Sequence, residues 1–286
     1  MYYLLGLSIF AASLNSIMLN KSHVNTKNEI FRFNFLCSIV WCVILLAVCR
    51  GEIKCSVQVL LWGILYGVTQ ALFILFKTAA MSSGSVSVTT LVGNSSLLIS
   101  IIVSMVVWGE KITVVDIIGL AVMAAAIFLC TYEKTDEVFN PKWKYYAIFF
   151  LIFAAGVGIS FKAFGKSGNL EYCSDMMFVS SVVMLVFYFT ACLLSGGFKN
   201  ENISCGSKSV FVKYALISGV LSCLYNRLNI FLSGSMAAVI FFPSFNGGVV
   251  FLSALLSACL CGEKMVKKRK IGLGLGIIGI IIIGIL

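Results

Sequence analysis

A long segment of this sequence occurs twice. A single ungapped offset aligns residues 82–130 with residues 235–283. It places Ser82 on Ser235 and Gly119 on Gly272, and it superposes two Gly-Glu-Lys triplets, at 109–111 and 262–264. Apolar residues match by chance in hydrophobic sequences, but serines, glycines and a whole polar triplet rarely fall on one offset. The sequence therefore predicts a chain built by duplication.

The composition places this duplication in a membrane. The chain has 286 residues, of which 60% are hydrophobic and 11% charged, and its mean hydropathy is +1.04. Neither a soluble globular domain nor a disordered chain has this balance. Two prolines in the whole chain favour long uninterrupted helices, whereas a transmembrane barrel shows short alternating segments. We predict an all-α integral membrane protein located in the cell membrane.

Apolar runs define the expected spans. A membrane-spanning helix needs about 20 mainly apolar residues, and the sequence offers about ten such runs by this criterion. They are residues 2–19, 31–49, 57–81, 84–108, 113–132, 143–165, 172–195, 209–233, 235–261 and 268–286.

The spans divide into two halves. Residues 1–132 form a predicted first five-helix repeat, residues 133–142 a polar linker, and residues 143–286 a second five-helix repeat. Because each half has an odd number of spans, the second half starts on the opposite face of the membrane from the first. The prediction is thus two inverted repeats, the architecture of secondary transporters.

The hairpins at 84–132 and 235–286 carry a family resemblance. Each hairpin contains a Gly-Glu-Lys triplet followed by Ile-Gly: Trp-Gly-Glu-Lys at 108–111 with Ile-Gly at 118–119, and Gly-Glu-Lys at 262–264 with Ile-Gly at 271–272. This pattern resembles the signature of the drug/metabolite transporter superfamily and its ten-helix EamA-type members. The resemblance extends to the whole chain as ten short-looped helices in two halves. It implies a secondary transporter whose cavity is lined by spans 1, 3, 4, 6, 8 and 9.

Two indicators of orientation disagree. The odd-numbered loops carry most of the Lys and Arg residues, so the positive-inside rule puts both termini outside. The family resemblance implies both termini inside. The two orientations stay open at this point.

The Gly-Glu-Lys triplets allow a structural and a functional interpretation. Each lies where one helix ends and the next begins, so glycine suits the end of the first helix and the acid suits the N-terminus of the second. The alternative is that the triplets act as gates. The structural interpretation is favoured.

The fourth and ninth spans indicate a binding site. Polar residues at 89–90 and 93–96 interrupt the fourth span near its middle, and the ninth contains Pro243 and Asn246, with Asn94 falling beside Asn246 under the offset. Interrupted segments in matching positions of two halves point to a transporter's midplane site. Close helix packing through small residues is the alternative, but neither amide is needed for packing. We expect Asn94 and Asn246 to face a shared central cavity.

Further polar residues lie within apolar spans and complete the predicted site. All eleven acidic residues fall in loops or near span ends, whereas three basic residues lie within spans and could bind an anionic or zwitterionic metabolite. Arg227 in particular offers paired donors to a carboxylate; snorkelling of these three side chains to the surface is the alternative. The predicted substrate-binding residues are Asn15, Tyr66, Gln70, Lys77, Asn94, Lys162, Tyr225, Asn226, Arg227, Pro243 and Asn246.

These features predict a secondary transporter, an exporter or exchanger, that moves a small organic metabolite such as an amino acid by alternating access. Its expected partners are that solute and membrane lipid, with no cofactor and no metal. The net charge of +10 is attributed to lipid and topology, not to nucleic acid. A multidrug efflux transporter, a lipid scramblase and an intramembrane enzyme are the alternatives, and the enzyme is disfavoured because the sequence has no His/Asp/Glu cluster.

Overall fold

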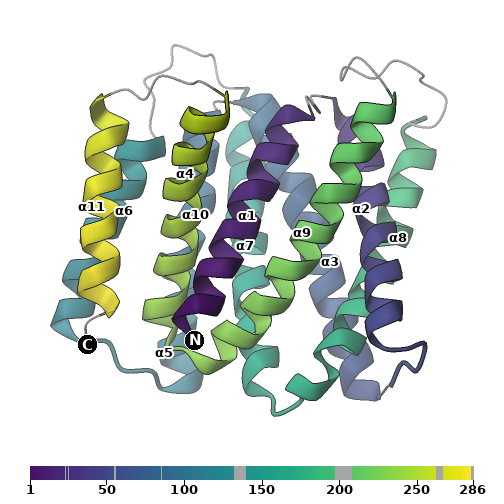
Figure 1. The fold of residues 1–286 in the computed structure, drawn as a ribbon, viewed down its shortest axis with the longest axis horizontal. Coiled ribbons are helices and arrows are strands. Elements are labelled where there is room, and N and C mark those ends of the chain that lie inside the picture. The colour runs from purple at the N-terminus through teal and green to yellow at the C-terminus, as the bar shows by residue number, and fades with distance from the viewer. Residues whose placement is uncertain are drawn as a thin grey trace.

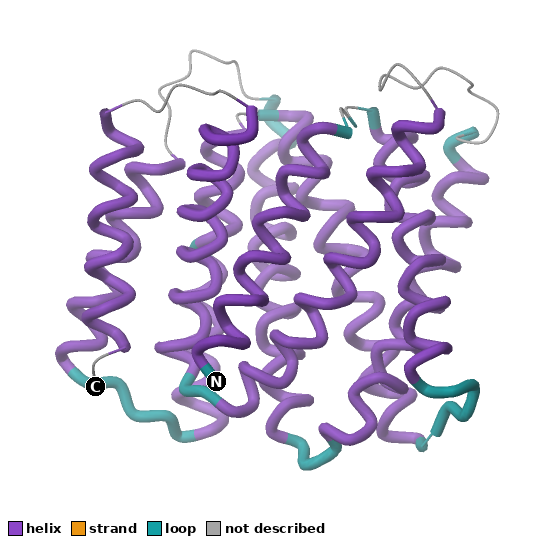
Figure 2. Tube along the Cα trace, in the orientation of Figure 1, coloured by secondary structure: helices purple, strands orange, loops and turns teal. Residues whose placement is uncertain are grey.

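The computed structural model describes residues 1–22, 24, 26–54, 56–84, 86–131, 140–196, 208–261 and 267–284. Within them the chain consists of helices that run roughly parallel to one direction (Figures 1 and 2). In chain order they are α1 (Tyr2–Lys21), α2 (Lys27–Val48), α3 (Val57–Ser83), α4 (Val86–Asn94), α5 (Ser96–Trp108), α6 (Val114–Thr131), α7 (Trp143–Lys166), the short 3-10 helix η1 (Leu170–Tyr172), α8 (Cys173–Leu194), α9 (Lys208–Ser235), α10 (Ala238–Cys261) and α11 (Lys267–Gly284).

These helices confirm the predicted membrane spans. Nine segments of the described residues are long and apolar enough to cross a membrane, one of them made of α4 and α5 together, and α11 contributes a shorter apolar segment at Lys270–Ile282. Helices suit this environment because all their backbone hydrogen bonds are made within the segment. The chain is a multi-pass membrane protein.

Both chain ends lie on one face of the helical bundle, here called the terminal face (Figure 1). Helices α2, α5, α7 and α9 end on this face, whereas α1, α3, α6, α8 and α10 end on the opposite face. The α5–α6 connection, which contains Glu110, and the end of α10 are therefore on opposite faces. Glu263 itself lies outside the described residues. The two halves run antiparallel, as the odd span count predicts.

Helix packing repeats between the halves. In the inverted pairing, α1 corresponds to α7, α2 to α8, α3 to α9, α4 with α5 to α10, and α6 to α11. Accordingly α1 packs against α9 just as α7 packs against α3, while α2 packs on α8 and α6 on α11. Gly119 and Gly272 are each the sixth residue of their helices, α6 and α11. The predicted equivalence of these glycines agrees with this pairing; the exact linker boundary stays a prediction, because residues 132–139 lie outside the described part.

One pair of glycine contacts shows the repeat at atomic level. A Cβ placed on Gly63 of α3 would lie 2.6 Å from Cβ of Val179 on α8. A Cβ placed on Gly219 of α9 would lie 2.8 Å from Cβ of Val40 on α2. In each case the third helix of one half receives a valine from the second helix of the other half. Small residues at such points let membrane helices approach closely.

Besides a smaller cluster around Phe33, Phe211 and Ala215, the apolar interior has two large clusters, each of which draws on both halves. One lies among α5, α6, α10 and α11 and includes Met123 and Phe251. The other lies among α2, α3, α7, α8 and α9 and includes Trp41, Phe164 and Met177. The repeats are therefore interleaved, and they do not form two separate cores.

The fourth and ninth spans differ in continuity. The fourth is divided at Ser95 into α4 and α5, as the polar interruption predicts. The ninth, in contrast, is the single helix α10, which continues through Pro243. Proline is the sixth residue of α10, so the carbonyl of Val239, four residues earlier, loses its helical donor. Membrane helices tolerate this because neighbouring groups satisfy the freed carbonyl. The expectation that both spans are broken is corrected for the ninth.

Candidate functional site: a branched chamber between the halves

The larger of two described cavities has a volume of about 460 Å³ and lies among α1, α2, α3, α8 and α9. Its lining includes Leu19 and Met81, at the ends of α1 and α3, and Val24 in the α1–α2 connection. All three positions belong to the face opposite the termini. The cavity therefore extends from the interior to that face.

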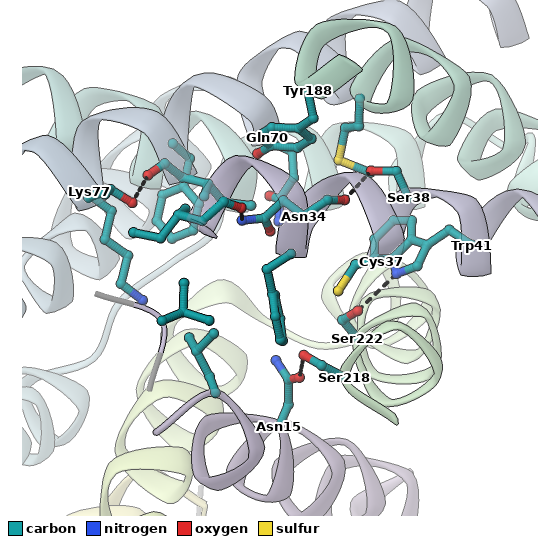
Figure 3. Close-up of a pocket in the computed structure, with 18 of the residues that line it drawn as sticks. Asn15, Asn34, Cys37, Ser38, Trp41, Gln70, Lys77, Tyr188, Ser218 and Ser222 are labelled. Atoms are coloured by element: carbon teal, nitrogen blue, oxygen red, sulfur yellow. Dashed lines mark hydrogen bonds between the residues drawn. The ribbon is translucent and has the colours of Figure 1, made fainter. Parts of the chain in front are cut away.

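Polar side chains on α1, α2, α3, α8 and α9 line this cavity (Figure 3). The indole Nε1 of Trp41 on α2 donates a hydrogen bond to Ser222 Oγ on α9 at 2.8 Å. The Ser218 hydroxyl, also on α9, donates to Asn15 Oδ1 on α1. These bonds hold the wall residues of α1, α2 and α9 in fixed orientations.

The second cavity has a volume of about 250 Å³ and lies among α3, α4, α5, α7, α9 and α10. Its wall is rich in aromatic rings, including Phe150 and Phe161 of α7 and Phe241, Phe242 and Phe245 of α10. The Phe241 and Phe245 rings stack with centroids 5.9 Å apart. The position of this cavity, between the divided fourth span and α10, is where the paired interruptions predict it.

The two cavities meet along one stretch of wall. Gln70, Phe73, Lys77, Met81 and Tyr225 line both of them. Four of these residues lie on α3 and one on α9, the helices that correspond to each other in the two halves. We call the combined space the chamber; it has a polar branch, among α1, α2 and α8, and an aromatic branch, among α4, α5, α7 and α10.

Lys77 is the one charged side chain among the described residues that line the chamber. It is half-buried, and its Nζ lies 5.9 Å from the centroid of the Phe73 ring. No described carboxylate lines either branch. A cation facing an aromatic ring and polar walls suits an anionic group as its partner.

Several buried polar atoms of the wall have no hydrogen-bond partner within the described chain. In the aromatic branch these are Gln70 Oε1, Asn94 Nδ2 and Asn229 Nδ2, and in the polar branch the Tyr188 hydroxyl. Buried polar groups are normally paired, so unpaired ones that line a cavity mark places where a ligand is recognised. Two amide donors and an ammonium group share the aromatic branch.

Neighbouring contacts explain why Asn229 is available and Asn226 is not. The Ser8 hydroxyl donates to Asn229 Oδ1 at 2.6 Å, which leaves the amide nitrogen without a partner. Asn226 accepts from the Tyr66 hydroxyl at 3.1 Å and donates to the Ser222 carbonyl at 2.7 Å. Asn226 therefore stabilises the wall, whereas Asn229 presents a donor to the chamber.

Seven of the eleven predicted binding residues line the chamber. They are Asn15, Gln70, Lys77, Asn94, Tyr225, Asn226 and Asn246. Asn94 and Asn246 share the aromatic branch, where the repeat places them. All six spans that the family resemblance implies contribute to the wall, and α2 and α8 contribute as well.

The other four predicted residues lie elsewhere. Tyr66 is buried behind the wall, where it holds Asn226. Pro243 is buried within α10 and does not line the chamber. Arg227 is exposed and lines neither branch, which corrects its predicted role as the carboxylate partner. Lys162 is fully buried but pairs with Glu110 outside the chamber, which corrects both its predicted binding role and the idea that it snorkels to the surface.

The sequence interpretation missed the wall of α2. Asn34, Ser38 and Trp41 line the polar branch, and their spacing of four and three residues places them on one helix face. A polar stripe in an otherwise apolar span was the available signal. Ser218 and Ser222 on α9 have the same four-residue spacing.

The first Gly-Glu-Lys triplet serves a different purpose from the one predicted for its acid. Gly109 ends α5 in the left-handed conformation, with φ of 65°, as expected for a glycine at this position. The N-terminus of α6, however, is capped by a reciprocal pair: Thr113 Oγ1 accepts from the Asp116 backbone N–H at 3.2 Å, and the Asp116 carboxylate accepts from the Thr113 backbone N–H at 2.8 Å. Glu110 instead accepts from the Ala238 backbone N–H, at the start of α10, at 2.7 Å. The second triplet lies outside the described residues.

The described residues do not offer a metal centre. No group of three or more His, Cys, Asp or Glu side chains within the described ranges comes close enough together to hold an ion. The chamber is therefore a site for binding through hydrogen bonds, charge and aromatic contact.

Comparisons with known proteins agree with this architecture. The profile of the EamA-like transporter family matches residues 1–132. A solved structure described only as the crystal structure of a protein is 15% identical, with a TM-score of 0.74 over 98% of this chain and 94% of its own. At this identity the likeness concerns the fold alone. No curated protein matches the chain.

Proposed function

Since residues 1–132 belong to the EamA-like transporter family, within the drug/metabolite transporter superfamily, we propose that this membrane transporter moves a small organic metabolite that bears a carboxylate, such as an amino acid. Transport proceeds by alternating access, with the chamber open in turn to each face. The protein acts as an exporter or an exchanger, and its partners are the solute and the surrounding lipid.

The charge of the chamber supports a carboxylate. Lys77 lies where the two branches meet, and no described acid lines the wall. A cation in a low-dielectric site is costly unless an anion offsets it. The amide donors of Asn94 and Asn229 share a branch with Lys77 and can hydrogen-bond the same anionic group.

The shape of the chamber supports an amphipathic solute. The aromatic branch offers phenylalanine rings to an apolar part, while the polar branch offers Asn34, Ser38 and Trp41 to polar groups. The volumes of about 460 and 250 Å³ are adequate for a metabolite of amino-acid size. The free acceptor of Gln70 suits a donor such as an ammonium group.

Multidrug efflux is the second candidate, because aromatic rings also attract organic cations. Lys77 disfavours it, since a drug cation would meet a like charge at the junction of the branches. A lipid scramblase and an intramembrane enzyme have less support, because the described chamber offers neither a hydrophilic lipid track nor a catalytic cluster.

The test is a ligand screen by thermal stabilisation of the purified protein, because a ligand that binds only the folded state raises the unfolding temperature. We expect carboxylate metabolites to stabilise the protein. Lys77→Gln should weaken their binding at least about tenfold, which corresponds to about 1.4 kcal/mol. Lys144→Gln, which removes an exposed charge at the start of α7, is the matched control. Stabilisation by quaternary ammonium compounds, unchanged in Lys77→Gln, would support multidrug efflux instead.

A further inference from the structure

We propose that the ion pair between Glu110 and Lys162 is the gate that closes the chamber toward the terminal face. Opening to that face requires this pair to separate. The gate rests on the proposed transport function but concerns a different part of the molecule from the binding wall.

The pair joins three segments that are distant in sequence. Lys162 Nζ on α7 contacts Glu110 Oε1 in the α5–α6 connection. The same Nζ donates to the Met236 carbonyl, in the α9–α10 turn, at 2.9 Å. The other carboxylate oxygen, Glu110 Oε2, accepts from the Ala238 backbone N–H at 2.7 Å. One pair of side chains thus ties the first half of the chain to two elements of the second half.

These contacts lie next to the aromatic branch of the chamber, on the side of the terminal face. Phe161, which precedes Lys162 in the chain, lines that branch. Phe241 and Phe242 line it as well. They lie three and four residues beyond Ala238, which is about one helical turn. Because α5 and α9 end and α6 and α10 begin on the terminal face (Figure 1), the pair lies between the chamber and that face.

The environment of the pair is that of a closed gate. The Lys162 side chain is 0% exposed and that of Glu110 16% exposed. Each charge bonds to its partner and to one backbone group, Lys162 to the Met236 carbonyl and Glu110 to the Ala238 N–H. A negative charge is also favoured at a helix N-terminus. In this state water has no access to the lysine.

The same chemistry makes the gate reversible. A buried ion pair offsets much of its attraction by the cost of removing two charges from water, so its net contribution is small. If the terminal face opens, water hydrates both groups and replaces the lost attraction. The closed, dry pair and the open, hydrated charges are two discrete arrangements, as a rocking transporter requires.

The arrangement also explains the use of a glutamate in the first triplet. Gly109 turns the chain sharply at the end of α5, with φ of 65°. Glu110 then follows at once and reaches α7 and α10, while Asp116 caps α6. The capping role predicted for the triplet's acid therefore belongs to another residue, and the glutamate is available for the gate.

The experiment measures access to the chamber without any substrate. Asn246→Cys, in a cysteine-free background, places one thiol in the aromatic branch. The protein is reconstituted in sealed vesicles that are sorted for one orientation through a tag at the C-terminus. A membrane-impermeant maleimide is then added on one side at a time. With the gate intact, labelling is expected from the face opposite the termini and is slow from the terminal face.

Loss of the gate should change only one of these rates. Glu110→Gln is expected to raise the labelling rate from the terminal face at least about tenfold, the change produced by about 1.4 kcal/mol. Lys111→Gln removes an exposed charge from the adjacent position and should leave both rates unchanged. Because Glu110→Gln leaves a buried lysine unpaired, Glu110→Gln combined with Lys162→Met provides a second variant without a buried charge, and the same rise is expected.

Unchanged labelling from the terminal face in the single and the double variant would overturn the gate. If the labelling rate rises in these variants but Lys77→Gln does not affect ligand binding, the gate is supported and the proposed solute is rejected. An equal rise in Lys111→Gln would show a general loosening of this face and would also overturn the assignment.

Discussion

Gly165 on α7 and Gly234 on α9 bring their backbones into direct contact. A Cβ placed on Gly165 would lie 2.6 Å from Cα of Gly234 and 2.7 Å from the Ile230 carbonyl oxygen. Backbone atoms cannot move aside as a flexible side chain can. The crossing of these two helices, close to the gate at Lys162, therefore depends on both glycines.

Gly165→Ala is expected to destabilise the protein by about 1–3 kcal/mol, the usual cost of overpacking a tight contact. The measurement is denaturation in detergent. Gly274→Ala is the matched control, because a Cβ on Gly274 of α11 meets no atom within 4 Å. That control should be neutral or slightly stabilising, since alanine is the better helix former. Equal effects of the two substitutions would contradict the contact.

Asn94 and Asn246 should both be accessible to water and protected by substrate. Each lines the aromatic branch, so single cysteines at the two positions are expected to react with soluble thiol reagents. A carboxylate ligand that occupies the branch should slow both reactions. Lys111→Cys, at an exposed position of the α5–α6 connection, provides a water-accessible control that ligand should not protect. If both chamber thiols stay unlabelled under all conditions, the cavity assignment is wrong.

Tyr66→Phe should affect the binding wall indirectly. It removes the hydroxyl that donates to Asn226 Oδ1 and leaves that buried oxygen without this donor. The expected loss of stability is about 1–3 kcal/mol, because an unsatisfied buried polar group is left behind. Tyr145→Phe, at an exposed tyrosine, should have little effect. Both variants are compared by thermal unfolding, with and without ligand.

Asp116→Ala separates helix capping from gating. Asp116 accepts from the Thr113 N–H and hydroxyl, each at 2.8 Å, at the start of α6. Its removal should cost about 0.5–2 kcal/mol of stability, as for other N-terminal caps. Labelling of the chamber from the terminal face should not rise, in contrast to Glu110→Gln. A rise in labelling with Asp116→Ala would assign gating to the whole α5–α6 connection.

The architecture was predictable because its signals are local or repeat along the chain. Apolar runs of membrane-spanning length identified the helices, and the repeated hairpin with an odd span count gave the inversion of the two halves. The break between α4 and α5 was visible as a polar interruption beside Gly93. The continuity of α10 was not visible, because proline interrupts many helices but is tolerated within membrane helices, where neighbouring groups satisfy the freed carbonyl.

The binding wall was only partly predictable because helix rotation decides which residues face inward. Tyr225, Asn226, Arg227 and Asn229 lie close together on α9, and steps of about 100° per residue distribute them around the helix. Packing then turns Tyr225 and Asn229 toward the chamber and Arg227 away from it. The pairing of Glu110 with Lys162 depends on a three-dimensional contact between residues far apart in the sequence, which no local pattern reports.

Lys77 has a consequence for the response to membrane voltage. With a carboxylate solute of net negative charge bound, the Lys77 charge is neutralised, and the loaded chamber changes its exposure from one side to the other with little movement of net charge. A zwitterionic amino acid, in contrast, leaves the positive charge in place. An empty chamber would carry the positive charge through the same rearrangement, and a full elementary charge crossing the membrane is worth about 2.3 kcal/mol per 100 mV. Exchange of one such anion for another should therefore be nearly independent of membrane potential, whereas net movement of the anion in one direction, which requires the empty carrier to return, should be electrogenic.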